Sequence, residues 1–531
     1  MRLDRRGLIL GGLASGLTPA TGWATVGHPQ QLGPIAGFNI RDFGAKGDGQ
    51  TIDSIAINKA IDAAASQGGG TVYFPAGTYA SYTLRLKSRV TLHLGQGAVL
   101  LAAPVPEGAT SGGYDEPEPM DEAYYRFQDF GHSHWRNSLI WGEGLTDIAI
   151  VGDGMIWGKG LTDGHPTEGY KPGDARPGVA NKSIGLKNCR NVLLRDFKIL
   201  QGGWFALLAT GVDNLTIDNL LVDTNRDGFD IDCCKNVRVT NCTINSPFDD
   251  AIVPKSSYAL GYPRTTENVL ISNCTLSGNY VIGSVMDGTF KRLKPNETMK
   301  IGRIKLGTES NGGFKNITIT NCVFDECRGI ALETVDGAAL EDITISNISM
   351  RGCTNAPLFL RLGARMRGPK GVDIGTLKRV LISNINSSGA SPLPSIIAGI
   401  RGHLIEDIKV ADCYFEQLGG GDDALAALLP PENDKRYPET DIFGKQLPAT
   451  GFFIRHARNV EFSHIEVATR VSDRRPAYWL DTVEDFRGFG LTHPTHDGVA
   501  QFRLANVTGF RTLAGERGYD LTFGTPVTRT F

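Results

Sequence analysis

The sequence predicts an all-β protein, a parallel β-helix in which the chain winds one coil per repeat. Segments that begin with Asn or Asp and continue with alternating apolar residues return every 22 or 23 residues, as at Asn191, Asn214 and Asn236. Short strands separated by Gly, Asn and Asp turns do not have the period of helices. A leucine-rich horseshoe is the alternative, but no helical segment fills the second half of each repeat. Stacked Asn side chains can bond to one another and to the turn backbone, which explains their recurrence.

Residues 1–25 are predicted to be an export signal. Arg5 and Arg6 precede an apolar run, and small residues from Ala20 to Ala24 offer a cleavage site. The paired arginines resemble a twin-arginine signal, and an ordinary secretory signal is the alternative. The run is shorter than the roughly 20 residues that cross a membrane, so we expect no anchor. Either signal predicts a periplasmic or secreted mature protein.

Residues 36–70 are predicted to form a strand, a Gly-rich turn and a capping helix. The helix is expected to begin near Asp53 and to end at the glycines 68–70. Its apolar face is formed by Ile57, Ala60, Ile61 and Ala64. Because a stack of coils has an open apolar end, this helix is well suited to cover it.

Residues 71–531 are predicted to be the body of the β-helix, in one domain with the cap. The repeat markers are Asp147, Asn191, Asn214, Asn236, Asn268, Asn316, Asp342, Asp407 and Asn459. We interpret the 44-residue interval from Asp147 to Asn191 as two coils, and other long intervals as coils with insertions. The conspicuous insertions, where a solenoid usually carries function, are 104–140, 256–266 with 285–300, and 415–450.

Composition excludes several classes of function. The 531-residue chain has a formal net charge of −3 and a pI near 6.4, which gives no basic surface for nucleic acid. Beyond the signal we find no membrane segment, and we expect a monomer. The nine cysteines lack metal-ligand spacing. Those that follow Asn or Asp are expected to be small buried residues of one ladder, namely Cys189, Cys242, Cys274, Cys322 and Cys413. A Cys322–Cys327 bridge stays open.

The most informative stretch is Asn225-Arg-Asp-Gly-Phe-Asp-Ile231, followed 23 residues later by Phe248-Asp-Asp-Ala-Ile-Val-Pro254. Superposed, the two segments bring Asp227 level with Asp250. Equivalent residues of successive coils become sheet neighbours roughly 4.8 Å apart, so these aspartates should stack, with Asp249 beside them. Three carboxylates on one surface repel each other, a cost that indicates chemistry or cation binding.

These segments resemble glycoside hydrolase family 28, the polygalacturonase family of right-handed parallel β-helices. The likeness covers 38–78, then Asn225-Arg-Asp-Gly and the pair Asp249-Asp250. Two further family signatures depart: Gly302 stands where the family has histidine, and Ala331 and Glu333 stand where it has arginine and lysine. In the family those two cations hold a uronate carboxylate. The resemblance therefore implies hydrolysis more firmly than it implies galacturonate as the sugar.

Hydrolysis of a glycoside needs one protonated carboxyl group and one ionised carboxylate. A crowded triad supplies that division, because mutual repulsion raises one pKa and leaves other groups ionised. The resemblance implies that Asp249 is the general acid, that Asp227 and Asp250 position and deprotonate water, and that the anomeric configuration is inverted. Asp230 and Asp232 read as ordinary outward-facing strand residues, without a role.

Further residues are candidates for substrate binding. The insertion 104–140 carries aromatic residues suited to stacking on sugars, and His134 is taken from it. Glu333 and Arg361 hold like places on successive coils, which allows an ion pair between them. The predicted substrate-binding set is Asn225, Lys255, Lys305, Glu309, Glu333, Arg361 and His134.

The sequence thus predicts a glycoside hydrolase acting on a plant or microbial polysaccharide or oligosaccharide, related to pectin, without cofactor or metal. One alternative is a polysaccharide lyase that holds Ca²⁺ on Asp227, Asp249 and Asp250, with Lys255 or Lys305 as base. The other is a non-catalytic carbohydrate-binding or adhesin β-helix. Sugar, linkage and endo or exo action stay open.

Overall fold

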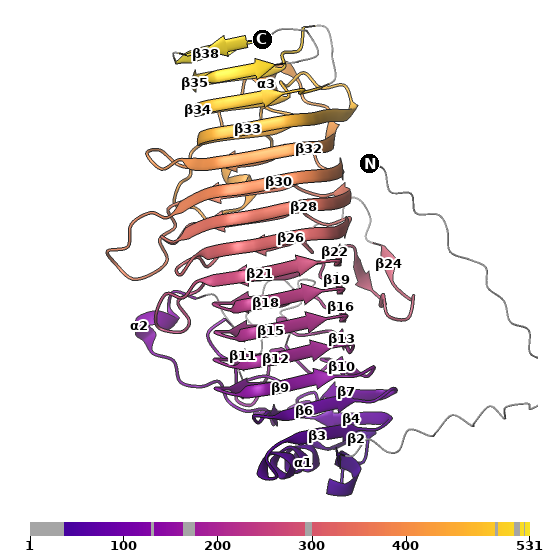
Figure 1. Cartoon of the computed structure of the whole chain (residues 1–531). Helices are drawn as coiled ribbons and strands as arrows, with labels where there is room; N and C mark the ends of the chain where they lie inside the picture. The colour runs from indigo at the N-terminus through magenta and orange to yellow at the C-terminus, as the bar shows by residue number, and fades with distance from the viewer. Residues whose placement is uncertain are drawn as a thin grey trace, which may run out of the picture. The chain divides into compact units, whose positions relative to one another are not determined.

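The computed structural model describes residues 37–128, 132–162, 176–292, 300–493, 498–513, 521–524 and 526–531. Gly37–Phe531 forms one compact unit of parallel strands stacked in successive coils (Figure 1). The predicted parallel β-helix is confirmed. The predicted export signal lies outside the described residues. None of the described helices is both long and apolar enough to cross a membrane.

The stack begins with short elements that close its first coil. They are β1 (Phe38–Asn39), η1 (Ile40–Phe43), β2 (Asp48–Ile52), α1 (Ser54–Ser66), β3 (Gly70–Phe74) and β4 (Gly77–Ser81). The helix α1 lies at the indigo end of the stack, and its four predicted apolar residues are wholly buried (Figure 1). Asp53 is the N-cap residue, but its carboxylate accepts hydrogen bonds from the Lys46 and Gly47 amides instead of capping the helix.

Each coil in the first half contributes one strand to each of three sheet faces. The site face is a six-stranded sheet of β5 (Leu84–Arg85), β8 (Ile140–Glu143), β11 (Lys182–Lys187), β14 (Phe205–Thr210), β17 (Asp227–Asp232) and β20 (Ile252–Lys255). A bridge between Ile252 and Ile304 continues the face. Beyond it lie β25 (Lys305–Leu306), β27 (Ile330–Thr334), β29 (Leu358–Leu362) and β31 (Ser395–Ala398).

The other faces are built from the remaining strands. In the first half these are β6 (Val90–Leu94), β7 (Ala98–Ala102), β9 (Thr146–Val151), β10 (Met155–Trp157), β12 (Arg190–Arg195), β13 (Lys198–Leu200), β15 (Asp213–Asp218), β16 (Leu221–Asp223), β18 (Lys235–Thr240), β19 (Thr243–Asn245), β21 (Thr266–Ser272) and β22 (Thr275–Ser277). Longer strands follow: β26 (Phe314–Asp325), β28 (Ala339–Cys353), β30 (Thr376–Gly389), β32 (Ile405–Gly419), β33 (Phe452–Val471) and β34 (Tyr478–Phe489).

Loops and the last coil carry the remaining elements. The loops hold α2 (Glu122–Tyr125), α3 (Asp423–Ala426), η3 (Thr440–Phe443) and the hairpin of β23 (Tyr280–Ile282) and β24 (Lys291–Arg292). The far end consists of β35 (Phe502–Val507), β36 (Phe510–Leu513), β37 (Leu521–Phe523) and β38 (Val527–Thr530). There β38 pairs with β35 and β37 with β36, both antiparallel, so added strands cover the last parallel coil.

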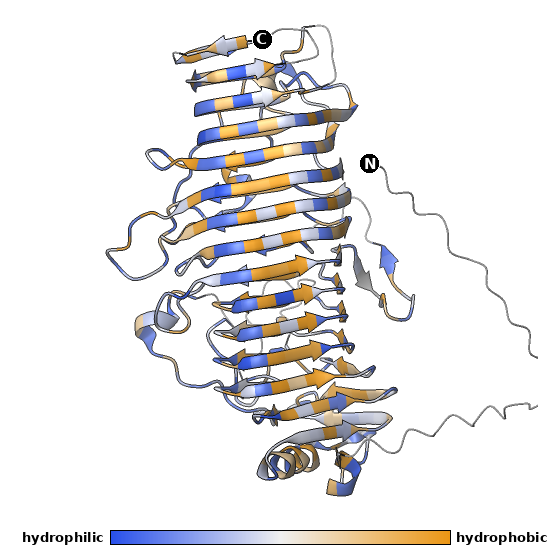
Figure 2. Cartoon of the chain, in the orientation of Figure 1, coloured by the Kyte–Doolittle hydropathy of each residue, from blue (hydrophilic) through white to orange (hydrophobic). Residues whose placement is uncertain are grey.

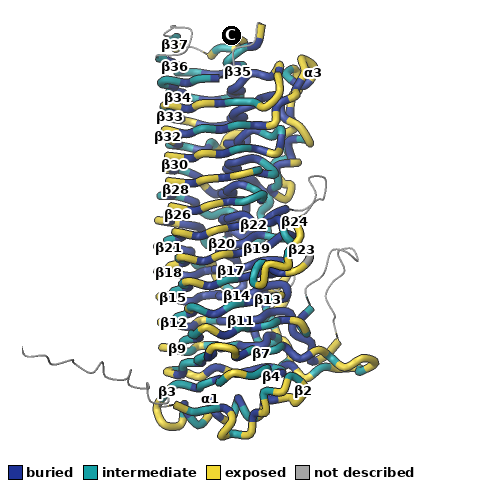
Figure 3. Tube along the Cα trace, turned by 90° about the vertical axis from the view of Figure 1, so that its right-hand side faces the viewer, coloured by how far each residue is buried: buried dark blue, intermediate teal, exposed yellow. Residues whose placement is uncertain are grey.

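Alternation along the strands places apolar side chains inside the coils. Figure 2 shows apolar and polar residues alternating along many of the strands, and Figure 3 shows buried residues running through the stack. On β15, for example, Leu215 and Ile217 are buried while Asn214 is exposed. Strands of the site face differ, because every residue of β14, β17 and β20 is buried. Loops therefore cover this face from outside.

The Asn ladder that marks the repeat is confirmed. Asn191, Asn214 and Asn236 have φ values of 58°, 55° and 57°, in the left-handed region that Asn tolerates better than most residues. Asn214 Nδ2 donates to Asn191 Oδ1 at 2.9 Å, and Asn236 Nδ2 donates to Asn214 Oδ1 at 3.3 Å. One residue type thus fits the bend and links each coil to the next.

Two expectations about the repeat were wrong. Asp147 and Asn191 lie on adjacent coils, because β9 pairs directly with β12 and Asn191 Nδ2 donates to Asp147 Oδ1 at 2.7 Å. The 44-residue interval is therefore one coil with a long excursion. Cys189 lies in a different turn from Cys242, so the cysteines do not form a single ladder. All nine are buried free thiols, so Cys322 and Cys327 are not bridged.

Candidate active site

The predicted aspartates meet on the site face. Phe229 of β17 is in register with Ile252 of β20, as the sequence comparison predicts, so Asp227 and Asp250 are equivalent positions of neighbouring coils. The Gly228 amide donates to the Asp250 carbonyl at 3.0 Å, which fixes the two segments side by side. One carboxylate oxygen from each of Asp227, Asp249 and Asp250 lies within 4.8 Å of the others.

The three carboxyl groups have different environments. Burial, followed by the nearby charges of Asp249 and Asp230, raises the pKa of Asp227 well above its ordinary value. Burial also opposes ionisation of Asp250, but Arg303 and Lys305 outweigh it and hold the pKa of Asp250 below its usual range. Arg303 Nε lies 2.6 Å and Lys305 Nζ 3.3 Å from Asp250. The free protein thus favours a proton on Asp227 and a charge on Asp250.

Asp249 is the most accessible of the three. Its side chain is 25% exposed, and Arg226 Nη2 lies 2.5 Å from its Oδ2. The Arg226 guanidinium in turn stacks over the Trp204 ring at 3.9 Å from the centroid. Arg226 occupies the middle position of the Asn-Arg-Asp segment, so this residue anchors the carboxylate of the following coil.

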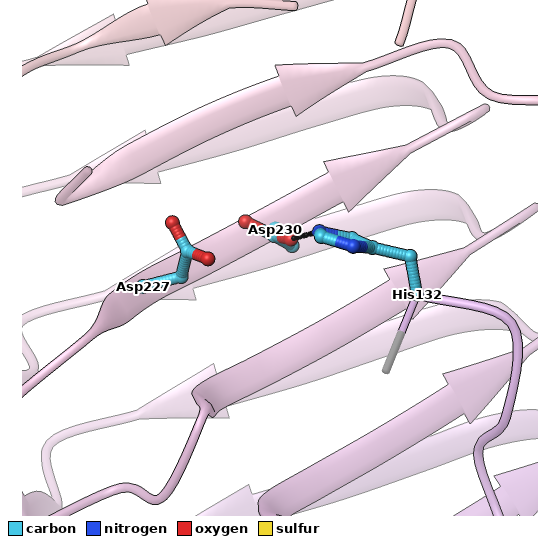
Figure 4. Close-up of side chains that lie close together, drawn as sticks. All are labelled: His132, Asp227 and Asp230. Atoms are coloured by element: carbon cyan, nitrogen blue, oxygen red, sulfur yellow. Dashed lines mark hydrogen bonds and ion pairs between the residues drawn. The ribbon is translucent and has the colours of Figure 1, made fainter. Parts of the chain in front are cut away.

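A second cluster continues from the first through Asp227. One ligand atom from each of His132, Asp227 and Asp230 lies within 4.8 Å of the others. His132 Nε2 and Asp230 Oδ2 are 2.8 Å apart, and Figure 4 shows Asp230 between Asp227 and the imidazole. Asp230 and Asp232 are 0% and 1% exposed, so the expectation of ordinary outward strand residues was wrong. The alternation of the strand points Asp230 and Asp232 away from the core, but an inserted loop covers them.

Lys255 and Glu309 form a buried pair beside these carboxyls. Lys255 Nζ lies 3.2 Å from Glu309 Oε2 and 4.0 Å from Asp230 Oδ2. Burial opposes the charge of Lys255, but Glu309 and Asp230 overcome it and raise its pKa well above the ordinary value. Arg367 Nη2 lies 3.1 Å from Glu309 Oε1. Both predicted residues thus lie beside the aspartates, as members of an ion-pair network.

The insertion 415–450 brings Tyr437 and Glu439 onto the third and fourth coils. Glu439 accepts from Arg303 at 2.6 Å and from Arg328 at 2.7 Å. The Lys305 ammonium donates to the Tyr437 hydroxyl at 3.2 Å. One segment therefore joins cations that lie more than 100 positions earlier in the sequence.

Glu333 and Arg361 are neighbours in register on β27 and β29, but they do not form the expected ion pair. Burial raises the pKa of Glu333 to about 7, against the opposing charges of Lys305 and Arg303. Its Oε2 accepts from the Thr308 hydroxyl at 3.2 Å. Arg361 donates to the Gly399 carbonyl at 3.0 Å and is 1% exposed. A desolvated, partly neutral Glu333 is a poor partner for arginine.

Two predicted residues stand apart from the carboxyl clusters. His134 packs edge-on against Tyr125 with centroids 6.3 Å apart, and burial lowers its pKa. Asn225 is half-buried, and its carbonyl accepts from the Phe248 amide at 3.0 Å. Asn225 therefore helps to shape the turns that present the aspartates.

Sequence reasoning missed several residues of the site. Arg303 and Glu439 carried no local signal, because their contacts join distant segments. His132 was visible only as one aromatic residue of an insertion. Gly302, where the family has histidine, has φ +48°, and a Cβ there would lie 2.4 Å from the Ser277 carbonyl oxygen. The backbone thus excludes a histidine from that place as it is built.

The carboxyl clusters could hold a cation by their donor types, yet cations of the protein already surround them. Arg303 and Lys305 contact Asp250, Arg226 contacts Asp249, and Lys255 lies near Asp230. Such compensation by side chains weakens the need for a metal at Asp250 in particular. The arrangement is suited to proton transfer between carboxyl groups of unequal acidity.

Comparison with known proteins agrees with the geometry. Residues 125–359 match the family model of glycosyl hydrolases family 28, and residues 37–107 match a model described as rhamnogalacturonase A/epimerase, pectate lyase-like. A probable polygalacturonase from Vitis vinifera is 29% identical over 321 residues, which are 56% of this chain and 61% of that protein. The chain thus spans less than two thirds of that relative.

Two solved structures share the fold. An exopolygalacturonase of family 28 from Yersinia enterocolitica has a TM-score of 0.57 at 18% identity, covering 92% of this chain and 79% of its own. An exopolygalacturonase from Thermotoga maritima has a TM-score of 0.51 at 18% identity, covering 82% and 92%. The chain is therefore similar to glycosyl hydrolases of family 28 over residues 125–359, and it shares the parallel β-helix fold of the two solved structures.

Proposed function

We propose that the protein is a glycoside hydrolase that cleaves a pectin-related polysaccharide or oligosaccharide through Asp227, Asp249 and Asp250. The observation that carries the proposal is the grouping of these carboxyls within 4.8 Å, with the pKa of Asp227 raised and that of Asp250 lowered. Glycoside cleavage needs such a pair, one group to protonate the leaving oxygen and one to act on water.

Two members of the triad, Asp227 and Asp249, are candidates to carry the catalytic proton. The family resemblance implies that Asp249, the most exposed member, donates the proton to the leaving group. Burial, however, favours the proton on Asp227 in the free protein. Carboxyls this close titrate as a group, so a proton held on Asp227 can reach Asp249 when a sugar displaces Arg226. Asp250, ionised beside Arg303 and Lys305, is the member best suited to orient and deprotonate water.

Inversion at the anomeric carbon is the outcome that the family resemblance implies. The nearest triad oxygens lie within 4.8 Å. Inverting enzymes usually separate their carboxyl groups by roughly 6.5–9.5 Å. The proposal of inversion therefore rests on the family resemblance and not on the distance between the triad oxygens. Proton NMR of the first anomer released decides the stereochemistry: the opposite configuration at the new reducing end is expected, and retention would contradict this part of the proposal.

The proposed sugar next to the cleaved bond is not simple galacturonate. Ala331 and Glu333 replace the family's two cations, and Glu333 is wholly buried. The nearby cations already have carboxylate partners, since Glu439 contacts Arg303 and Arg328. Lys255, Lys305 and Arg361, the cations of the predicted substrate-binding set, are only 6%, 3% and 1% exposed. A branched or mixed pectic glycan is therefore the proposed substrate class.

Asp249→Asn tests the hydrolytic proposal. We expect kcat to fall by about 100-fold or more, the usual range for loss of general acid catalysis. Reducing-end release is measured on a panel of pectic glycans, with thermal unfolding measured in parallel. Asp412→Asn is the matched control, because the same change there affects a carboxylate of β32 that is 61% exposed. Near-normal turnover in Asp249→Asn would show that the assignment is wrong.

The product assay also separates the rival functions. Ultraviolet-absorbing unsaturated products whose formation stops with a chelator would identify a lyase, and binding without any product would identify a carbohydrate-binding module. Efficient release of galacturonate from plain polygalacturonate would overturn the substrate proposal alone. We further propose that the protein acts outside the cytoplasm, because residues 1–25 have the composition of an export signal.

A further inference from the structure

We propose that His132 is a positioning residue of the active site, which acts through Asp230 to set where the proton resides among the buried carboxyls. The inference rests on the proposed hydrolytic function and concerns a residue outside the aspartate triad. His132 belongs to the insertion between β7 and β8, whereas Asp230 belongs to β17, 98 positions later.

The imidazole is held in one place. Its ring packs edge-on against Phe205 of β14, with centroids 4.7 Å apart at 66°. His132 is 7% exposed, and Asp230 is wholly buried. Phe205 is also in register with Asp227 on the next strand. The insertion therefore places a ring nitrogen one coil from the triad and keeps water away from it.

The hydrogen bonding favours one tautomer. Asp230 Oδ2 lies 2.8 Å from Nε2, while the buried Nδ1 has no hydrogen-bond partner among the residues that the structure describes. A carboxylate only accepts, and a proton on Nδ1 would be a buried donor without an acceptor, which is costly. The neutral ring with the proton on Nε2 satisfies both conditions, so the ring donates to Asp230.

This donation influences Asp227. The titratable groups around Asp230 are His132, Asp227, Asp232 and Lys255. The Lys255 ammonium lies 4.0 Å from Asp230. The His132 ring therefore donates to Asp230 and Lys255 adds a positive charge nearby, while burial and the charge of Asp230 raise the pKa of Asp227. Without the histidine, the Asp230 carboxylate beside Asp227 loses this hydrogen bond. The imidazole thus directs the proton to Asp227.

The insertion supplies what the third coil lacks. Gly302, at the place of the family's histidine, has no room for a side chain, because its Cβ would lie 2.4 Å from the Ser277 carbonyl oxygen. The imidazole beside the aspartates comes instead from His132, about 170 positions earlier, in the loop between β7 and β8. The loop between β7 and β8 therefore places an imidazole on the same sheet face.

The test compares His132→Met with His132→Gln, side chains of similar length that differ in the N–H donor. Met should lower kcat by about 10- to 100-fold, the cost of one hydrogen bond to a charged group, with a smaller change in KM. It should also move the pH limits of kcat/KM upward by about one unit, because an anion that loses a donor binds its proton more tightly. Gln should retain most of the activity and the wild-type profile.

A purely structural role gives a different result. A folding defect lowers activity equally at every pH and affects Gln and Met alike, which would overturn the inference. His464→Asn is the control for loss of a histidine, since that side chain is 73% exposed and asparagine tolerates the residue's φ of 51°. Selective ¹⁵N NMR adds a readout without substrate: the wild type should show a neutral Nε2–H ring, altered in Asp230→Ala. A doubly protonated ring or an Nδ1–H tautomer would also overturn it, even if no glycan is cleaved.

Discussion

Glu439→Gln should change the preference of the proposed hydrolase between charged and neutral sugars. Glu439 accepts from Arg303 at 2.6 Å and from Arg328 at 2.7 Å, and its side chain is 26% exposed toward solvent. Arg303 also contacts Asp250, so the Glu439 pair lies next to the aspartate cluster. A uronate carboxylate that approaches these cations therefore meets the charge of Glu439. The glutamine keeps the size and an acceptor oxygen but removes that charge.

The magnitude follows from Coulomb's law. A carboxylate that shares the same two guanidinium groups lies about 5 Å from Glu439, where the repulsion is about 0.8 kcal/mol at a dielectric constant near 80 and about 3.3 kcal/mol near 20. These limits correspond to about 4- and 250-fold in affinity. Because Glu439 is about one quarter exposed, solvent screens part of the interaction. We expect the substitution to favour the charged substrate by about 10-fold.

The assay is the ratio of kcat/KM for polygalacturonate to kcat/KM for a neutral pectic side-chain glycan. The ratio cancels any loss that arises because Arg303 is held less firmly against Asp250. Glu432→Gln is the matched control: it removes the same charge from the same insertion at 28% exposure, but that carboxylate pairs with His456 at 3.0 Å. An unchanged ratio in Glu439→Gln, or an equal change in Glu432→Gln, would refute the reasoning.

Two predictions concern stability. Asn214→Ala should cost about 2–3 kcal/mol, because it removes both ladder hydrogen bonds and alanine tolerates the left-handed region less well than asparagine. Asn214→Gly should cost less, and equal losses in urea unfolding would contradict this explanation. Burial raises the pKa of Glu333 to about 7 from an ordinary value of 4.5, so the folded state holds the proton to higher pH and stability should fall as pH rises between these values. Glu333→Gln should remove up to about 3 kcal/mol of this dependence, measured by unfolding at pH 5 and pH 8, and an unchanged slope would exclude Glu333 as its source.

The repeat made the fold predictable from local pattern. Residues such as Asn214 sit where the chain bends, and the bend, the side-chain ladder and the strand alternation all recur at one period. The same period predicted that Phe229 would lie beside Ile252, which the sheet register confirms. The repeat period did not predict the number of coils between Asp147 and Asn191, because a looped-out excursion of this length cannot be distinguished from a second coil.

The electrostatics of the site could not be predicted in the same way. Asp230 reads as an outward strand residue, yet a loop from 98 positions earlier covers it with His132. Arg303 reads as part of one coil, yet Glu439 reaches it from 136 positions later. These partners have no fixed spacing, since insertions fold back over the coils in ways that a repeat does not encode.

By itself the sequence determined the coil architecture, the capping helix and the stacking of Asp227 on Asp250, because each depends on periodic neighbours within one or two coils. Only the tertiary structure decided which carboxyl holds a proton, which cations are already paired, and where the histidine lies. The physical reason is that pKa values and ion pairs depend on burial and on charges within a few ångströms, and in this protein inserted loops supply both.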